Sequence, residues 1–187
     1  MLLTKRSFFA IILLVRLEDI MSNFIEITTS EIENVFKLIG KDWMLITASD
    51  GKKVNCMTAS WGNMGVLWNN DVCTVFIRPQ RYTYEFVEKS DTLSLSFFGE
   101  KYREALGFCG RVSGRDCDKI KEAGFTSALF EKTPIICEAD MVLVCKKLYA
   151  DDIKEECFVS DAPMSNYANK DFHRFYICKI EKVLKKV

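Results

Sequence analysis

The spacing of apolar positions after residue 28 predicts one short amphipathic helix. Apolar side chains recur at the i, i+3, i+4, i+7 interval that places them on one face of a helix: Ile32, Val35, Phe36 and Ile39. Ser30 and Glu33 have the spacing of a capping box, and Gly40 follows as a stop signal. We therefore expect a helix that packs its apolar face on the rest of the domain.

Runs of strand length and strand composition dominate the remaining chain. They cover residues 43–48, 54–61, 72–77, 92–98, 135–149, 156–159 and 172–183. Asp50 and Gly51 form a favourable hairpin turn between the first two runs. Helices are predicted between strands, at residues 82–89, 101–106 and 116–123, the last capped by Asp116 and ended by Gly124.

This order of elements predicts a mainly β fold with inserted helices. Several antiparallel strands at short spacing are typical of a small closed or split barrel. The strict strand–helix alternation of a doubly wound parallel sheet is missing.

Length and charge narrow the class of protein. A chain of 187 residues has the length of one domain. Its 26 basic and 26 acidic residues balance, so no net field attracts a nucleic acid or an anionic membrane.

Residues 1–20 form a separate segment. Lys5 and Arg6 precede an apolar run over 7–15 that imitates a signal peptide, but no small-x-small cleavage site follows. The run is also shorter than the roughly 20 residues that span a bilayer. We interpret 1–20 as an N-terminal extension, with Met21 as the natural start and the domain over 21–187. A membrane-surface anchor is the alternative.

The eight cysteines are scattered along the chain, without a Cys-x-x-Cys pair and with a single histidine. Zinc and iron–sulfur sites need closely spaced ligands, so no metal site is expected. Four cysteines lie inside apolar runs, where a thiol behaves as a small hydrophobe. We expect reduced thiols in a cytoplasmic protein.

Residues 55–61 are the first candidate for binding chemistry. Small and hydroxylic side chains occupy a strand position where bulky ones are usual: Asn55, Cys56, Met57, Thr58, Ala59, Ser60 and Trp61. Such a segment lets backbone N–H and C=O groups approach a flat heterocycle, and two hydroxyls are available. An edge strand with an ordinary polar face is the alternative.

A second candidate follows the strand at 72–77. Pro79 ends that strand because it cannot donate to a ladder. Arg78 and Arg81 then stand at the start of the predicted helix 82–89, where free N–H groups favour an anion. Two guanidinium groups and the Thr83 hydroxyl suit a phosphomonoester. A solvated turn with surface arginines is the alternative.

A third stretch, residues 109–116, is glycine-rich and basic and leads into Lys119. It could contact a phosphate or a ribityl chain. It has neither the G-x-x-x-x-G-K-[ST] loop nor the strand–G-x-G-x-x-G–helix context, so no nucleotide-binding fold is implied.

Taken in order and at their separations, these segments resemble the flavoredoxin branch of the flavin reductase-like FMN-binding proteins. The matching residues are Asn55 to Trp61, Arg78-Pro-x-Arg-x-Thr83, Ser113-Gly-Arg-Asp-x-Asp-Lys119 and His173-Arg-Phe-Tyr176. The resemblance covers residues 30–187 and leaves the first twenty outside.

The resemblance implies an antiparallel Greek-key FMN-binding split β-barrel that forms a homodimer. Residues 55–61 would line the isoalloxazine ring, and the phosphate would lie between Arg78, Arg81, Thr83 and Ser113. Trp61 or Phe98 would be shared between subunits. Many members of the family have another small residue at the position of Cys56. The cysteine in this sequence adds the hypothesis that flavin binding is redox-sensitive.

Two functions follow from the resemblance. The first is an NAD(P)H-dependent flavin reductase that passes hydride through bound FMN; the second is a flavoredoxin-type electron carrier with a protein partner. A third hypothesis is a split-barrel binding module that holds no flavin. His173 is either a polar contact where a nicotinamide docks or a surface histidine without a role. No catalytic carboxylate or nucleophile is required, because the flavin performs the chemistry.

Overall fold

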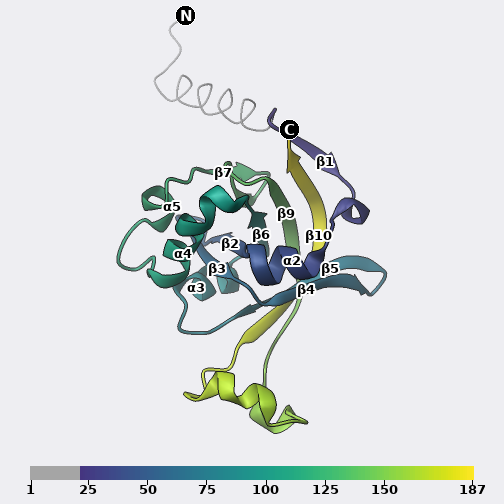
Figure 1. Cartoon of the computed structure of the whole chain (residues 1–187), viewed down its shortest axis with the longest axis vertical. Helices are drawn as coiled ribbons and strands as arrows, with labels where there is room; N and C mark the ends of the chain where they lie inside the picture. The colour runs from purple at the N-terminus through teal and green to yellow at the C-terminus, as the bar shows by residue number, and fades with distance from the viewer. Residues whose placement is uncertain (1–21) are drawn as a thin grey trace, which may run out of the picture.

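The computed structural model describes residues 22–187 (Figure 1). The predicted extension over residues 1–20 lies outside these residues. Within 22–187, no helix is long and apolar enough to cross a membrane.

A single antiparallel sheet forms the body of the protein, as the strand pattern predicts. Its spatial order is β3-β2-β6-β9-β10-β5-β4, and β1 pairs with β10. The strands are β1 (Phe24–Ile27), β2 (Met44–Ser49), β3 (Val54–Ala59), β4 (Gly62–Leu67), β5 (Asn70–Ile77), β6 (Thr92–Phe97), β9 (Met141–Asp152) and β10 (Arg174–Lys186). A separate hairpin consists of β7 (Ser127–Phe130) and β8 (Thr133–Ile136).

The two edge strands of the seven-strand path are consecutive in the chain. Only Ser60 and Trp61 separate the end of β3 from the start of β4. Such a short link requires the sheet to curl until its edges meet at residues 60–61, which we call the β3–β4 corner. This curl produces the barrel.

The helices are short and cover the ends and one side of the barrel (Figure 1). They are α2 (Val35–Lys37), α3 (Tyr82–Lys89), α4 (Arg103–Arg111) and α5 (Lys119–Glu122). One apolar cluster, which includes Ile46, Val75 and Tyr176, fills the barrel. A second, which includes Leu45, Leu106 and Ile136, lies between the sheet and α4 and α5.

Residues 153–172 project from the barrel between β9 and β10 as an arm (Figure 1). The arm contains two 3₁₀ helices, η4 (Glu155–Cys157) and η5 (Ala162–Tyr167). The prediction of a strand over 156–159 is therefore wrong. The arm has a small aromatic core of its own. This core consists of Phe158, Tyr167 and Phe172, whose ring centroids are 4.9–6.0 Å apart.

The N-terminal helix is the least accurate of the predictions. Two 3₁₀ or π segments, η1 (Thr29–Glu31) and η2 (Leu38–Asp42), flank α2 in its place. Thr28 is the capping residue rather than Ser30, and its N–H donates to the Glu31 carboxylate at 2.8 Å. Asn34 has a φ of 45°, which breaks the helix and turns Phe36 outward, where it is 93% exposed.

Other boundaries differ where glycine or a turn interrupts an apolar run. The predicted strand 54–61 ends at Ala59, and 135–149 divides into β8 and β9. Strands β4 and β7 were not predicted. Helix α4 extends through residues 109–111, and Asp118 caps α5 in place of Asp116. Gly124 ends that helix with a φ of 74°, as predicted.

Candidate functional site

The β3–β4 corner forms one wall of a cavity of about 200 Å³. Its lining residues are Met57, Thr58, Ala59, Ser60, Trp61, Phe76, Arg78, Arg81 and His173. The fold thus brings three separate sequence segments to one place. Arg78 and Arg81 lie on the same side of the molecule as the backbone of residues 57–61.

Strand β3 offers a free backbone edge to this site because it pairs only with β2. The Thr83 hydroxyl donates to the Cys56 carbonyl at 2.9 Å, so that carbonyl points away from β2. Alternate residues of a strand direct their backbone groups to the same side. The Thr58 backbone therefore points outward as well.

Asn55 and Thr83 hold this edge against α3. The Asn55 Nδ2 donates to the Thr83 Oγ1 at 3.0 Å, and both side chains are buried. The Thr83 hydroxyl thus has a donor and an acceptor within the protein. These hydrogen bonds fix β3 relative to α3, and the contact of Thr83 with a phosphate stays a prediction.

Arg78 also has partners within the protein. Its guanidinium forms an ion pair with Asp171, donates to the Asn166 carbonyl at 2.8 Å and lies 5.5 Å from the ring centre of Tyr167. These three residues belong to the arm or its base. The hydrogen bond from Arg78 lowers the pKa of Asp171. Arg78 therefore anchors the arm, and the predicted pair of free guanidinium groups is reduced to one.

Arg81 differs from Arg78 because no acceptor within residues 22–187 bonds its half-buried guanidinium. Burial lowers its pKa. Lys119 is 3% exposed; its Nζ donates to the Cys109 carbonyl at 3.0 Å and has no carboxylate partner in the described chain. Burial, and more weakly Arg81, lower the pKa of Lys119. Two cations that are partly shielded from water and have no carboxylate partner within residues 22–187 favour the binding of an anion between them.

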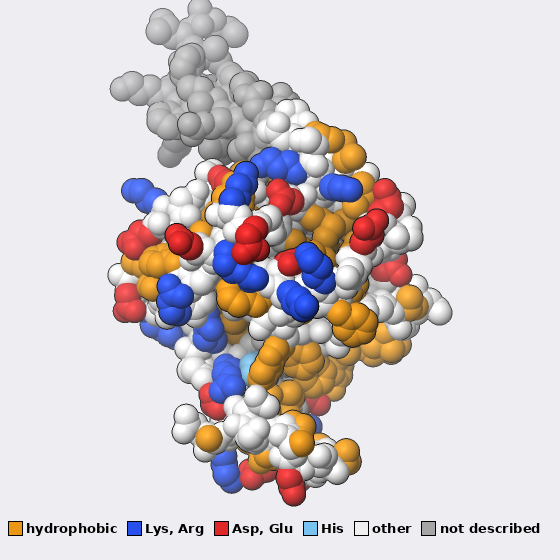
Figure 2. All heavy atoms as spheres, viewed as in Figure 1, with side chains coloured by type: hydrophobic (Ala, Val, Ile, Leu, Met, Phe, Trp, Pro, Cys, Tyr) orange, Lys and Arg blue, Asp and Glu red, His pale blue; other side chains and the backbone are white. Residues whose placement is uncertain are grey.

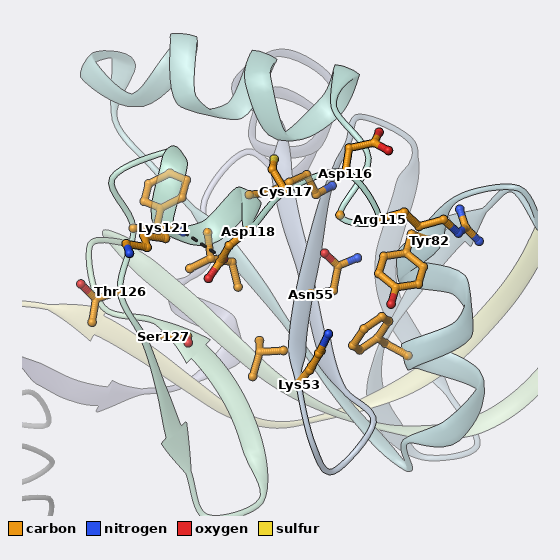
Figure 3. Close-up of a pocket in the computed structure, with 16 residues that line it drawn as sticks. Lys53, Asn55, Tyr82, Arg115, Asp116, Cys117, Asp118, Lys121, Thr126 and Ser127 are labelled. Atoms are coloured by element: carbon orange, nitrogen blue, oxygen red, sulfur yellow. Dashed lines mark hydrogen bonds between the residues drawn. The ribbon is translucent and has the colours of Figure 1, made fainter.

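A larger cavity, of about 690 Å³, is lined by Tyr82, the residue that follows Arg81 in the chain (Figure 3). In Figure 3, Asn55 points from β3 into the space between Tyr82 and the segment 115–118. Lys119 lies in the wall of this cavity. Arg81 lines the smaller cavity and Lys119 lines the larger one, and the charge of Arg81 is close enough to lower the pKa of Lys119. We call these two cations the cationic junction.

Gly114 permits the close approach of that segment to β3. A Cβ atom at Gly114 would lie 2.2 Å from the Asn55 Oδ1, closer than atoms can pack. The neighbouring Ser113 lines neither cavity, and its hydroxyl accepts from the Arg115 N–H at 3.2 Å. Ser113 thus shapes this turn.

His173 is buried, so the interpretation as a surface histidine is wrong. The Tyr167 hydroxyl is 2.9 Å from its Nδ1, and the Trp61 ring centre is 5.1 Å from its own. Burial, reinforced by the charge of Arg78, lowers its pKa to about 4. His173 is therefore neutral at pH 7 and forms a polar part of an aromatic wall.

Two predicted site residues point elsewhere. Phe98 packs between Tyr102 and Phe125, with ring centroids 5.5 and 5.0 Å away, and lies outside the cavity of Trp61. Its ring belongs to the core of this chain, and its role as a flavin contact shared between subunits stays a prediction. The Cys56 side chain points into the core towards α4.

Two residues of the site, Phe76 in the cavity wall and Tyr167 against His173, have no recognisable signal in the sequence. Phe76 lies in an apolar strand like many core residues, and Tyr167 lies in an arm that no pattern predicted. Within residues 22–187, no cluster of three or more His, Cys, Asp or Glu side chains could hold a metal ion.

Fold and site together define a mainly antiparallel split barrel with a cationic junction beside an aromatic pocket. The model of the flavin reductase like domain family matches residues 36–184. The chain belongs to this family.

Solved structures of similar fold include three flavin-related proteins. The flavoredoxin of Methanosarcina acetivorans is 22% identical, with a TM-score of 0.61, over 78% of this chain and 68% of the other. The FMN-binding protein of Thermus thermophilus is 18% identical, with a TM-score of 0.62, over 86% and 80%. The NADH:FAD oxidoreductase SgcE6 of Streptomyces globisporus is 13% identical, with a TM-score of 0.59, over 77% and 75%.

A curated relative, an uncharacterized protein of Aeropyrum pernix, is 32% identical over 99 residues. The match covers 51% of this chain and 37% of the length of that relative.

Proposed function

We propose that this site binds FMN and that the chain is an NAD(P)H-dependent flavin reductase. The observation that carries the proposal is a pair of neighbouring cations, the half-buried Arg81 and the buried Lys119, neither of which has a carboxylate partner within residues 22–187. Arg81 lines the aromatic pocket of the β3–β4 corner. A phosphomonoester is the anion that such a pair fits, and a flat ring fits the pocket beside it.

The residues divide between the two ends of FMN. The backbone of residues 57–61, with Trp61, Phe76 and His173, would hold the isoalloxazine ring. Arg81, Lys119 and the N-terminus of α3 would hold the phosphate. Asn55 and Thr83 act as positioning residues, because they fix β3 against α3.

FMN supplies the hydride and electron transfer itself, so the protein contributes binding and orientation. Trp61, Phe76 and His173 form an aromatic wall that keeps water from one side of the pocket. A neutral His173 adds no charge there, and its Nε2 remains available to a polar group of a bound nicotinamide. The structural neighbour from Streptomyces globisporus is an NADH:FAD oxidoreductase, which supports a nicotinamide nucleotide as the donor.

The size of the pocket supports a homodimer. Pockets for small ligands usually measure about 300–1,000 Å³, larger than the 200 Å³ found at the β3–β4 corner. Trp61 is 44% exposed at its rim. A second copy of the chain would cover this rim and complete the pocket.

A flavoredoxin-type electron carrier is the second candidate. A row of aromatic rings runs from the pocket across the sheet, with centroids 6.1–6.5 Å apart: His173, Phe76, Phe175, Tyr149 and Trp68. Figure 2 shows hydrophobic side chains gathered between the barrel and the arm, beside the histidine. This surface suits a protein partner that receives electrons.

The visible spectrum of the purified protein tests the cofactor, and stopped-flow mixing tests the role. We expect flavin bands that NADH or NADPH bleaches rapidly. A flavin that ignores both nucleotides would favour the carrier. A colourless protein that does not bind added FMN would contradict both and favour a flavin-free binding module. We place the protein in the cytoplasm, where its eight free thiols stay reduced.

A further inference from the structure

Two thiols lie in contact directly behind the cationic junction. Cys56 of β3 and Cys109 of α4 are 53 positions apart in the chain, and their sulfur atoms are 3.9 Å apart. Both side chains are completely buried. The pair connects the strand that lines the proposed cofactor site to the helix packed behind it.

Lys119 links this pair to the anion site. Its Nζ donates to the Cys109 carbonyl at 3.0 Å, and the Cys109 sulfur lies 4.0 Å from the Lys119 carbonyl. The thiol of Cys56 is the donor towards Cys109. This hydrogen bond, and the charge of Lys119, lower the pKa of Cys109, whereas the pKa of Cys56 is raised. One thiol favoured as thiolate beside a protonated one is the usual arrangement of a reactive pair.

A second buried pair in the same protein lacks this arrangement. Cys73 and Cys145 have sulfur atoms only 3.5 Å apart, inside the barrel core. The pKa of both thiols is raised, and burial contributes to each shift. Proximity is therefore common to both pairs, and only the pair beside Lys119 has a thiol whose pKa is lowered.

We propose that Cys56 and Cys109 form a redox-sensitive dithiol that closes to a disulfide and weakens anion binding at Arg81 and Lys119. The oxidant is a hydroperoxide, small enough to enter through the larger cavity, whose wall contains Asn55 and Lys119.

The chemistry balances in two steps. The Cys109 thiolate attacks an oxygen of the hydroperoxide, the O–O bond breaks, and the leaving oxygen takes up the proton that the thiol released. The Cys56 sulfur then attacks the resulting sulfenic acid; the S–S bond forms, the S–O bond breaks, and water leaves with the Cys56 proton. Two thiols lose two electrons and two protons, and the hydroperoxide is reduced.

Closure must change the site because an S–S bond is only about 2.05 Å long. The sulfur atoms, now 3.9 Å apart, have to approach each other. Helix α4 carries the Cys109 carbonyl that holds the Lys119 ammonium, and β3 carries the free edge. Loss of the aligned ammonium should weaken FMN binding about tenfold, the effect of one hydrogen bond to a charged group. This part rests on the proposed function.

The first test is chemical and needs no flavin. The full chain is treated with hydrogen peroxide, alkylated, digested and analysed by mass spectrometry. We expect a linked peptide pair containing Cys56 and Cys109, reversed by dithiothreitol, while Cys73 and Cys145 stay free. Unchanged alkylation of Cys56 and Cys109, with only other thiols oxidised, would overturn the proposal.

The second test measures FMN affinity by equilibrium dialysis before and after peroxide. We expect about tenfold weaker binding in the oxidised protein, no response in Cys109→Ser and a retained response in Cys117→Ser, a thiol in the cavity wall. A disulfide that leaves the affinity unchanged would refute the coupling. Failure of the untreated protein to bind FMN would contradict the proposed function instead, and the peptide result would still decide the dithiol.

Discussion

Replacing Arg81 with methionine should separate binding from stability. Methionine keeps an apolar stem in the same space and removes the guanidinium. No hydrogen bond within the described chain depends on that guanidinium, and burial disfavours its charge, as its lowered pKa indicates. The free energy of unfolding of the flavin-free protein should therefore stay the same or rise by up to about 1 kcal/mol.

FMN affinity should change in the opposite direction. A hydrogen bond to a charged group contributes about 1.5–3 kcal/mol, which corresponds to a loss of roughly 10- to 100-fold in affinity. Urea unfolding measures the stability, and equilibrium dialysis measures the affinity. Unchanged FMN affinity in Arg81→Met would refute the assignment of Arg81 to the phosphate.

Arg78→Met is the matched control. Arg78 pairs with Asp171 and holds the arm, so its loss should lower the free energy of unfolding by about 1–2 kcal/mol. Its effect on FMN affinity should be smaller than that of Arg81→Met. Equal behaviour of the two variants would contradict the distinction between an anchoring and a binding arginine.

Three further predictions follow from single contacts. Gly114→Ala should displace Asn55 from Thr83, because the added Cβ atom would collide with the Asn55 side chain. The free energy of unfolding in urea should fall by about 1–3 kcal/mol, and FMN binding should weaken. An unchanged unfolding curve would contradict the close contact. His173 has a pKa of about 4 in the folded protein, below its usual 6.5, so the unfolded chain binds the proton more readily. Between pH 6.5 and 4 the wild type should therefore lose up to about 3 kcal/mol more of its free energy of unfolding than His173→Gln. Parallel pH profiles of the two proteins would refute this. Phe98→Ala should lower the free energy of unfolding by about 3 kcal/mol with no change in FMN affinity per folded molecule. A selective loss of FMN affinity would instead support Phe98 as a flavin contact.

The sequence predicted the strands that carry regular apolar runs, and it placed residues 57–61 near Arg81. It could not predict β4, because Gly62 and Gly65 interrupt the apolar signal that marks a strand. Nor does any local pattern bring the arm to Arg78, since Asp171 is 93 positions away.

The pairing of Arg81 with Lys119 was also beyond sequence reasoning. The sequence pattern predicts a pair of cations within one segment, Arg78 and Arg81, because these two residues are neighbours in the chain. The three-dimensional fold gives one of them a carboxylate and places Lys119 beside the other. Which buried charges are neutralised depends on long-range contacts.

Comparison of FMN with riboflavin tests the central claim most directly, because the two ligands differ only in the phosphate. Equilibrium dialysis of each ligand against the flavin-free protein should give FMN an affinity at least about 100-fold higher, since the proposal assigns Arg81 and Lys119 to the phosphate alone. Equal affinities for FMN and riboflavin, or no binding of either, would contradict the account.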